Sequence, residues 1–151
     1  MGKKWHPEKF GYKYKDFTSP YSTKAPWPCM RGDMRNSGQL RVKHKKDQGS
    51  KLSETVHFRT GNAIFSTPNI GEGDRIYVGS ADYVFYAFDP FEKEVIWSHK
   101  TDEIIDCAAC IDPKGNVYLP AADANVYAFD SEGNKRWIYD VLHDRPKHQL
   151  S

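Results

Sequence analysis

The sequence predicts an all-β fold of repeated antiparallel sheets, and three observations support that prediction. Most of the stretch from Ser80 to Trp97 recurs 41 residues later, so that residues 55–89 and 96–130 share ten identities in 35 positions. Short runs rich in β-branched and aromatic residues alternate with turn residues over residues 54–140. Each copy holds four such runs. A four-stranded repeat of roughly 40–45 residues is typical of a β-propeller blade.

The predicted strands follow one another in the same order in both copies. In the first copy they are residues 56–59, 64–70, 75–79 and 84–88. In the second copy they are residues 95–99, 105–111, 116–119 and 125–129. Residues 135–139 open a third copy, so we expect two four-stranded antiparallel blades and part of a third.

Four aspartates recur at matching places in the two copies. Asp82 and Asp123 lie in the predicted turn between the third and fourth runs, and Asp89 and Asp130 end the fourth run. A carboxylate in such a turn accepts hydrogen bonds from nearby backbone amides. Acid–base catalysis uses one site, whereas these residues appear in both copies. We therefore expect structural capping.

Two tryptophans, Trp97 and Trp137, follow the Tyr-Ala-Phe-Asp run of each copy. Because one meander cannot bury both of its faces, neighbouring blades must stack. The tryptophans and the small alanines of the two runs are expected to supply that surface. Propellers close with about 4–8 blades, so two copies and one strand do not close a ring. A protein partner or self-association is expected to complete the propeller.

A basic, aromatic arm precedes the repeats. Residues 1–51 hold 13 Lys/Arg against 4 Asp/Glu, a net of +9, whereas residues 52–151 carry a net of −7. Residues 1–26 show no helical or strand period, which predicts an extended arm. Charge interleaved with rings suits contact with a protein, including the chain's own acidic repeats; single-stranded nucleic acid and an anionic lipid surface are the alternatives. The candidate partner-binding residues are Trp5, Phe10, Tyr12, Lys13, Tyr14 and Lys15.

The chain divides into four parts: the arm at residues 1–26, a leading segment and basic linker at 27–53, the blades at 54–140, and a tail or truncated start of a further blade at 141–151. No apolar run resembles a secretory signal or reaches the roughly 18–20 residues of a membrane helix. An odd number of cysteines, three, favours a reduced compartment. We expect a cytoplasmic protein if Met1 is the native start, and a periplasmic or extracellular one if a leader was removed.

Two short motifs suggest chemistry. Cys107-Ala-Ala-Cys110 has the spacing of zinc and redox sites. It falls in a predicted strand, where residues three apart point to opposite faces, and it has no second pair. Structural packing is favoured, and Cys107 and Cys110 are weak candidate metal ligands. Arg31-Gly-Asp33 spells the integrin tripeptide, but we expect Arg31 and Asp33 to pair with the blades. The six histidines lack ligand spacing: His6, His44, His57, His99, His143 and His148.

These stretches together resemble the quinoprotein-type, or PQQ-like, repeat family. Residues 87–97 and 128–137 resemble its Ala-x-Asp-x-x-x-Gly-x-x-x-Trp pattern, and residues 76–82 resemble its strand and turn before that pattern. Residues 27–33, Trp-Pro-Cys-Met-Arg-Gly-Asp, resemble the Trp-Pro-x-x-Arg-Gly-Asp segment ahead of the first blade in many members. The chain departs from the family at residues 92–93, where Glu-Lys replaces Thr-Gly.

The resemblance implies a β-propeller and two possible functions. The first is a non-catalytic scaffold, because members without cofactor ligands hold protein partners on propeller faces and exposed strand edges. The second is a fragment of a PQQ-dependent alcohol or sugar dehydrogenase, in which the quinone and a calcium ion sit on the propeller axis beside a catalytic aspartate. No residue of this chain matches that ligand set. The scaffold is therefore favoured, with no catalytic or cofactor-binding residue, and PQQ with calcium stays the alternative.

Overall fold

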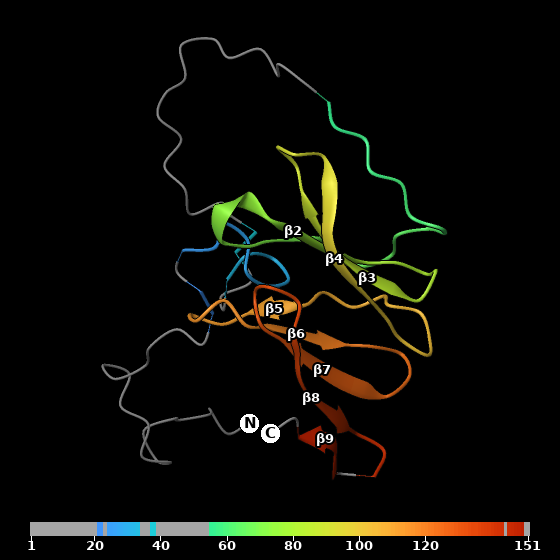
Figure 1. Cartoon of the computed structure of the whole chain (residues 1–151). Coiled ribbons are helices and arrows are strands. Elements are labelled where there is room, and N and C mark those ends of the chain that lie inside the picture. Colours follow the sequence, from blue (N-terminus) through green and yellow to red (C-terminus); the bar gives the residue numbers. More distant parts are fainter. Residues whose placement is uncertain (1–20, 23, 34–36, 39–54, 144, 150–151) are drawn as a thin grey trace, which may run out of the picture.

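The computed structural model describes residues 21–22, 24–33, 37–38, 55–143 and 145–149. These residues form strands, turns and one short 3-10 helix, η3 (Glu72–Asp74), and they contain no α-helix (Figure 1). No helix among them is long and apolar enough to cross a membrane. The strands are β1 (Asn69–Ile70), β2 (Ile76–Gly79), β3 (Val84–Asp89), β4 (Glu94–Lys100), β5 (Cys110–Ile111), β6 (Val117–Pro120), β7 (Asn125–Phe129), β8 (Lys135–Asp140) and β9 (Arg145–Gln149).

The strands form two antiparallel sheets that lie one above the other (Figure 1). The first sheet has the order β1-β2-β3-β4, and the second has the order β5-β6-β7-β8-β9. Consecutive strands are neighbours throughout, as in a meander. The predicted all-β class and the antiparallel four-stranded unit are therefore confirmed, and the second sheet carries a fifth strand that the sequence pattern did not indicate.

The assignment of strands to copies was wrong. Strand β4 pairs with β3, with Ala87 opposite Trp97, so it closes the first sheet and does not open the second. In the same way β8 pairs with β7 and belongs to the second sheet, where β9 lies on its other edge. The run 56–59 pairs with no strand that the structure describes. A repeat has no intrinsic start, and hydrogen bonding between strands, which the period does not reveal, decides where each unit begins.

The predicted strands at 64–70 and 105–111 are each reduced to two paired residues, β1 and β5. In the first sheet the side chain of Ser66 takes the place of the backbone hydrogen bonds that a longer β1 would make to β2. The Ser66 hydroxyl donates to the carbonyl of Gly79 at 2.8 Å and accepts from its amide at 3.0 Å. Because this serine satisfies both backbone groups of Gly79, the chain can leave the sheet at that point.

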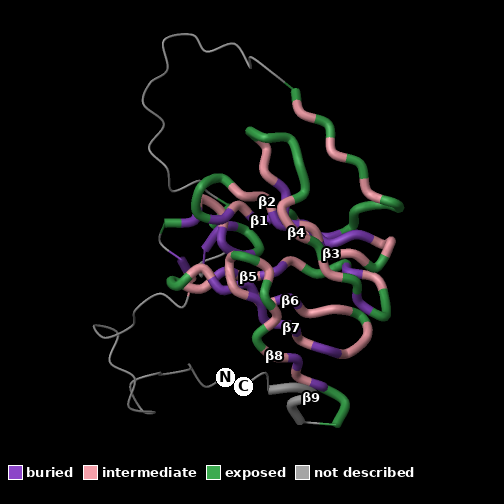
Figure 2. The backbone as a smooth tube through the Cα atoms, viewed as in Figure 1, coloured by how far each residue is buried: buried purple, intermediate pink, exposed green. Residues whose placement is uncertain are grey.

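The core lies between the two sheets, where buried residues of both meet (Figure 2). Phe85 of β3 faces Phe129 of β7 with ring centroids 6.3 Å apart. Ile105, which is 0% exposed, packs on Gly79 of β2. A Cβ at Gly79 would overlap the Ile105 side chain, so only glycine allows the sheets to approach this closely at that point.

Residues 21–22 and 24–33, from the end of the arm and the leading segment, join the first strands of both sheets. Trp27 exchanges two backbone hydrogen bonds with Ile70 of β1, each 3.0 Å long. The amide of Ile111 in β5 donates to the carbonyl of Pro28 at 2.8 Å, and the amide of Ser22 donates to the carbonyl of Ile111 at 2.8 Å. This segment thus covers the edges that β1 and β5 would otherwise expose. Most of the arm (1–20) and of the basic linker (39–54) lies outside the described residues.

Candidate functional site

The turn aspartates Asp82 and Asp123 organise equivalent polar clusters. The Asp82 carboxylate accepts hydrogen bonds from the amide of Val84 at 3.0 Å, from the amide of Gly61 at 2.6 Å and from the Tyr86 hydroxyl at 2.7 Å. The Asp123 carboxylate accepts from the amides of Asn125 and Asp102 and from the Tyr127 hydroxyl. Each carboxylate thus caps backbone amides of its turn.

Each cluster changes the acidity of its members. Burial opposes ionisation of Asp82, but the hydrogen bonds from Tyr86, Gly61 and Val84 outweigh it, so the pKa of Asp82 is lowered. Burial, together with the hydrogen bond to the charged Asp82, raises the pKa of Tyr86 to about 12. The same causes raise the pKa of Tyr127. At neutral pH each carboxylate is ionised and each phenol is protonated, which makes both clusters structural at that pH.

Asp89 and Asp130 lie at the starts of the β3–β4 and β7–β8 hairpins. The Asp89 carboxylate accepts from the amides of Phe91 and Glu92 at 2.8 and 3.1 Å. The Asp130 carboxylate accepts from the amide of Asn134 at 2.9 Å. Both carboxylates therefore cap backbone amides of their hairpins.

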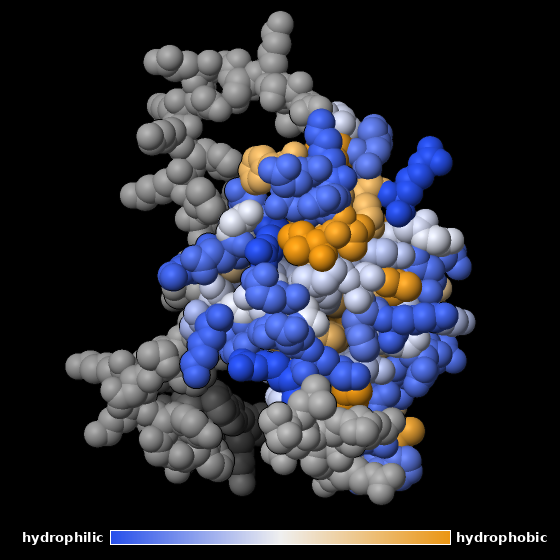
Figure 3. Space-filling model, viewed as in Figure 1, coloured by the Kyte–Doolittle hydropathy of each residue, from blue (hydrophilic) through white to orange (hydrophobic). Residues whose placement is uncertain are grey.

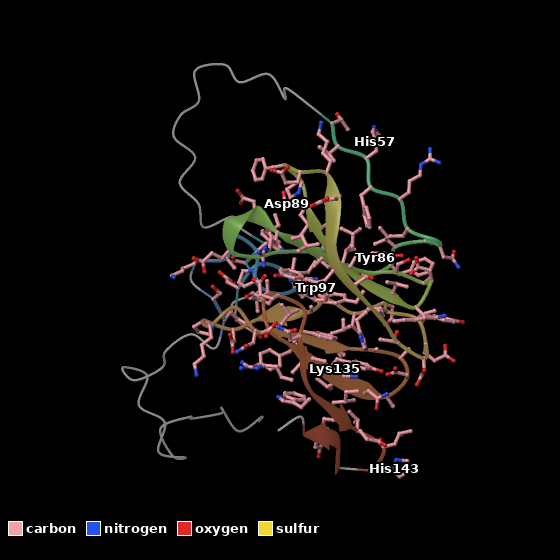
Figure 4. The ribbon with its side chains drawn as sticks, viewed as in Figure 1. His57, Tyr86, Asp89, Trp97, Lys135 and His143 are labelled. Carbon is pink, nitrogen blue, oxygen red and sulfur yellow. The ribbon has the colours of Figure 1, made fainter. Side chains whose placement is uncertain are left out.

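The hairpin at residues 131–133 seats the second sheet on Trp97 of the first. The carbonyl of Ser131 accepts from Trp97 Nε1 at 3.2 Å and from Arg75 Nη1 at 2.8 Å. A Cβ at Gly133 would lie 2.5 Å from Cγ of the indole, so the glycine allows the turn to rest on the ring. Phe129 packs beside the same ring at 5.3 Å. Figure 4 shows Trp97 between the two sheets. Trp97 thus lies in the contact between the two sheets.

Trp137 holds the equivalent place on the second sheet, because Ala128 lies opposite Trp137 as Ala87 lies opposite Trp97. Its ring contacts Tyr118 at 5.8 Å. No turn of the described chain covers it; an open hollow of about 510 Å³ lies beside it instead. We call this the Trp137 face, and its residues are Asn116, Tyr118, Asp130, Asn134, Lys135, Arg136 and Trp137.

An arginine is held at the rim of the Trp137 face. Arg136 Nη1 donates to the amide oxygen of Asn116 at 2.7 Å, which fixes the guanidinium near Trp137. On the first sheet Arg75 plays the comparable part, and it binds the docked turn. Sequence reasoning missed both arginines. Asn116 occupies the position of Arg75 in the second copy, and the arginine lies on β8 instead, so the repeat alignment did not reveal it.

The cysteines and the Arg-Gly-Asp motif form no site in the described part of the chain. Cys107 lies in a bend before β5, so the prediction that Cys107 and Cys110 share one strand was wrong. Burial raises the pKa of both thiols. No group of three His, Cys, Asp or Glu residues within the described ranges is placed to hold a metal. Asp33 is buried and accepts from the amide and hydroxyl of Ser37. The pairing of Arg31 and Asp33 with the blades stays a prediction.

The three histidine side chains that the structure describes lie in different parts of the fold. His99 packs on Tyr127 and Phe129 at 5.2 and 5.0 Å, and burial lowers its pKa. His57 lies on the extended segment before the first sheet and His143 at the turn after β8 (Figure 4). The remaining histidine side chains and the arm residues Trp5, Phe10, Tyr12, Lys13, Tyr14 and Lys15 lie outside the described part of the chain, so their proposed role stays a prediction.

Comparison with known proteins supports the fold. No protein-family model matches the chain, and no curated protein matches it. Among solved structures, the quinohemoprotein alcohol dehydrogenase of Comamonas testosteroni is similar, with a TM-score of 0.59 and 18% identity over 80% of this chain. The match spans 20% of that enzyme. At this identity the similarity concerns the fold and not the activity. It agrees with the resemblance to the PQQ-like repeats.

Proposed function

We propose that this chain is a non-catalytic interaction module of propeller-type repeats, which binds a protein on the Trp137 face. One observation carries the proposal: a hairpin fills this face on the first sheet, whereas no hairpin among the described residues fills it on the second. An occupant would rest a glycine turn on Trp137 and present a carbonyl to its indole N–H and to Arg136. Aromatic and arginine side chains of this kind dominate the binding energy of many protein interfaces.

The face is polar around one aromatic anchor, as protein interfaces commonly are. Its charged groups include Lys135, Arg136 and Asp130, and Arg136 is already oriented by Asn116. The remainder of the surface shown in Figure 3 is mainly hydrophilic, with apolar side chains in small separate patches.

A site-specific photo-crosslinking experiment tests this function. A photoreactive amino acid replaces Arg136 in one variant and Lys114 in a control, and both are expressed in the source cells. We expect one discrete protein to cross-link to position 136, and its yield to fall at least about tenfold when Trp137→Ala is added. Equal cross-linking at the two positions, or a yield that Trp137→Ala leaves unchanged, would contradict the proposal.

The second candidate is a fragment of a PQQ-dependent dehydrogenase, which the structural similarity to such an enzyme favours. The described residues do not fit that cofactor set. Calcium takes about 6–8 oxygen ligands, whereas Asp82 and Asp123 already bind turn amides and tyrosine hydroxyls. Adding PQQ and calcium to the protein and recording the quinone absorbance separates the candidates. A saturable spectral change would support the enzyme fragment and contradict the proposal of a non-catalytic module.

A further inference from the structure

Residues 55–60 form an extended segment with unpaired backbone edges. Exposure alternates along it: residues 55, 57 and 59 are exposed, and residues 56, 58 and 60 are half-buried. This alternation is that of a β-strand with one face packed. No backbone hydrogen bond joins residues 55–59 to any other residue that the structure describes. The segment thus shows the exposure pattern of a strand, and no described strand pairs with it.

Residues 55–60 and the loop after them lie against the first sheet in the same way as the end of β4 and the loop after it lie against the second sheet. The amide of Gly61 donates to the Asp82 carboxylate at 2.6 Å, and the amide of Asp102, 41 residues later, donates to the Asp123 carboxylate at 3.2 Å. Two backbone hydrogen bonds show the same correspondence. The amide of Ala81 donates to the carbonyl of Ala63 at 2.9 Å, and the amide of Ala122 donates to the carbonyl of Ile104 at 3.1 Å.

The side chains repeat the same relation. Phe58 packs on Tyr86 and Phe88 of β3 at 5.2 and 4.8 Å. His99, at the matching position of β4, packs on the corresponding tyrosine and phenylalanine of β7 at 5.2 and 5.0 Å. Residues 55–60 therefore occupy the place of an outer strand, such as β4, in a sheet whose other strands are absent from the described chain.

The surface beneath the missing strands is open. Ile105 is 0% exposed because the first sheet covers it, with Gly79 against its side chain. Its equivalent on the first sheet, Ile64, is 44% exposed, and the adjoining Phe65 is 68% exposed. Burying apolar area of this kind contributes roughly 25 cal/mol per Å². The difference between Ile64 and Ile105 marks a contact that a further sheet would make.

We propose that residues 55–60 pair antiparallel with a β-strand of another polypeptide, which completes a third sheet over Ile64. The proposal rests on the function proposed above and names a second docking edge. The register of β3 and β4 specifies the partner strand: a small residue lies opposite Val56, as Ala87 lies opposite Trp97, and a bulky apolar residue lies opposite Phe58, as Phe85 lies opposite His99. The strand before it ends in a glycine, as β2 does, to cover Ile64.

A second copy of this chain does not supply such a strand from its described part. The strands with this pattern, β3 and β7, are hydrogen-bonded on both edges. The outer edges of β4 and β9 face no described strand, but their sequences, EVIWSHK and RPKHQ, lack an alanine between aromatic residues. Strand addition from a different protein is a common way to recognise an exposed edge, with backbone bonds giving affinity and alternate side chains giving specificity.

Cross-linking with a peptide tests the register. The full chain carries Val56→Cys and Cys107→Ser, and the probe is a synthetic peptide of residues 76–89 with Ala87→Cys. A control peptide carries Tyr86→Cys instead, whose side chain points to the other face. We expect the disulfide with the Ala87→Cys peptide to form at least about tenfold faster in a glutathione buffer, because pairing raises the effective concentration of the thiol. Equal rates with the two peptides would overturn the proposal.

A tethered variant gives a second readout on the whole chain. A duplicate of residues 64–93 is inserted between Leu52 and Ser53, so that it precedes residues 55–60 as β1 to β3 precede β4. We expect alternate amides of residues 55–59 to exchange with deuterium roughly 10–100-fold more slowly than in the parent chain. The matched control changes the Ala87 of the duplicate to Arg and should remove that protection.

Protection of the inserted strands without protection of residues 55–59 would contradict the proposal. The Trp137 face is unchanged in these variants. The proposed pairing of residues 55–60 can therefore be contradicted while cross-linking at Arg136 still supports an interaction module. In the same way, cross-linking at Arg136 can fail while the pairing of residues 55–60 is supported.

Discussion

Gly133 is, with Gly79, one of two glycines at which the two sheets come into close contact. It has φ +86 and lies against Trp97, where a Cβ would be 2.5 Å from the ring. Gly133→Ala should lower the free energy of unfolding by about 2–4 kcal/mol, because a left-handed strain and an overlap add together. Gly73→Ala is the matched control: φ is +72 but no atom lies within 4 Å, so about 1 kcal/mol is expected. Urea denaturation measures both, and equal losses would argue against a tight Gly133 contact.

The hydrogen bond between Tyr86 and Asp82 predicts a loss of stability in alkali. The pKa of Tyr86 is raised from 10.0 to about 12, so the folded state holds the phenolic proton more tightly than the unfolded state does. The contribution of this hydrogen bond to the free energy of unfolding is complete below pH 10 and is lost as the pH rises to about 12. Tyr86→Phe should reduce stability at neutral pH by about 1–2 kcal/mol and flatten this alkaline decline. Denaturation curves across that range test it, and an unchanged slope would count against the bond.

Acid should also weaken the clusters around Asp82 and Asp123, because it protonates their carboxylates. The pKa of Asp82 and that of Asp123 are both lowered in the folded state, so their contributions are present above the ordinary carboxyl pKa of 3.8 and disappear as the pH falls through the folded values. Asp82→Asn removes the charge that titrates. We expect this variant to be less stable at neutral pH and to lose less stability than the parent chain in acid.

At the scale of the strand, β4 and β8 carry tryptophans at matching positions, but a described hairpin lies only on the ring of Trp97. Trp97→Ala should cost about 3–5 kcal/mol, because the ring contacts Phe85 and Phe129 and supports the hairpin through Ser131. Trp137→Ala should cost at most half as much, since its face is open on one side. Thermal or urea unfolding of the two variants provides the comparison. Equal costs would mean that Trp137 is covered as fully as Trp97.

For the whole molecule, the leading segment links the two sheets at their first strands. A chain that starts at residue 39 lacks the bonds from Ile70 to Trp27 and from Ile111 to Pro28. We expect these two amides to lose their protection against hydrogen exchange and the melting temperature to fall. Retained protection of both amides in the shortened chain would show that the segment contributes little to holding the sheets together.

The two ends of the stack do not match one another, which bears on self-association. The hairpin of the first sheet carries Lys93, with φ +61, where the second sheet has Gly133. A lysine side chain there would overlap a tryptophan, so copies should not stack head to tail on Trp137. We expect light scattering to show no oligomer that depends on Trp137, and Lys93→Gly to permit one. An oligomer of the parent chain that Trp137→Ala dissolves would contradict this expectation and favour a ring of identical chains.

The 41-residue repeat and the all-β class could be predicted from the sequence, because alternation along strands and turn residues between them are local features. Which strands share a sheet could not be predicted, because a run such as 94–100 has the same periodicity whether it pairs with the strand before it or the strand after it. The tertiary structure also leaves residues 55–60 without a described neighbour, and it places a described hairpin on Trp97 but none on Trp137. Equivalent residues of a repeat differ in this way because their surroundings depend on which other strands and turns lie next to them.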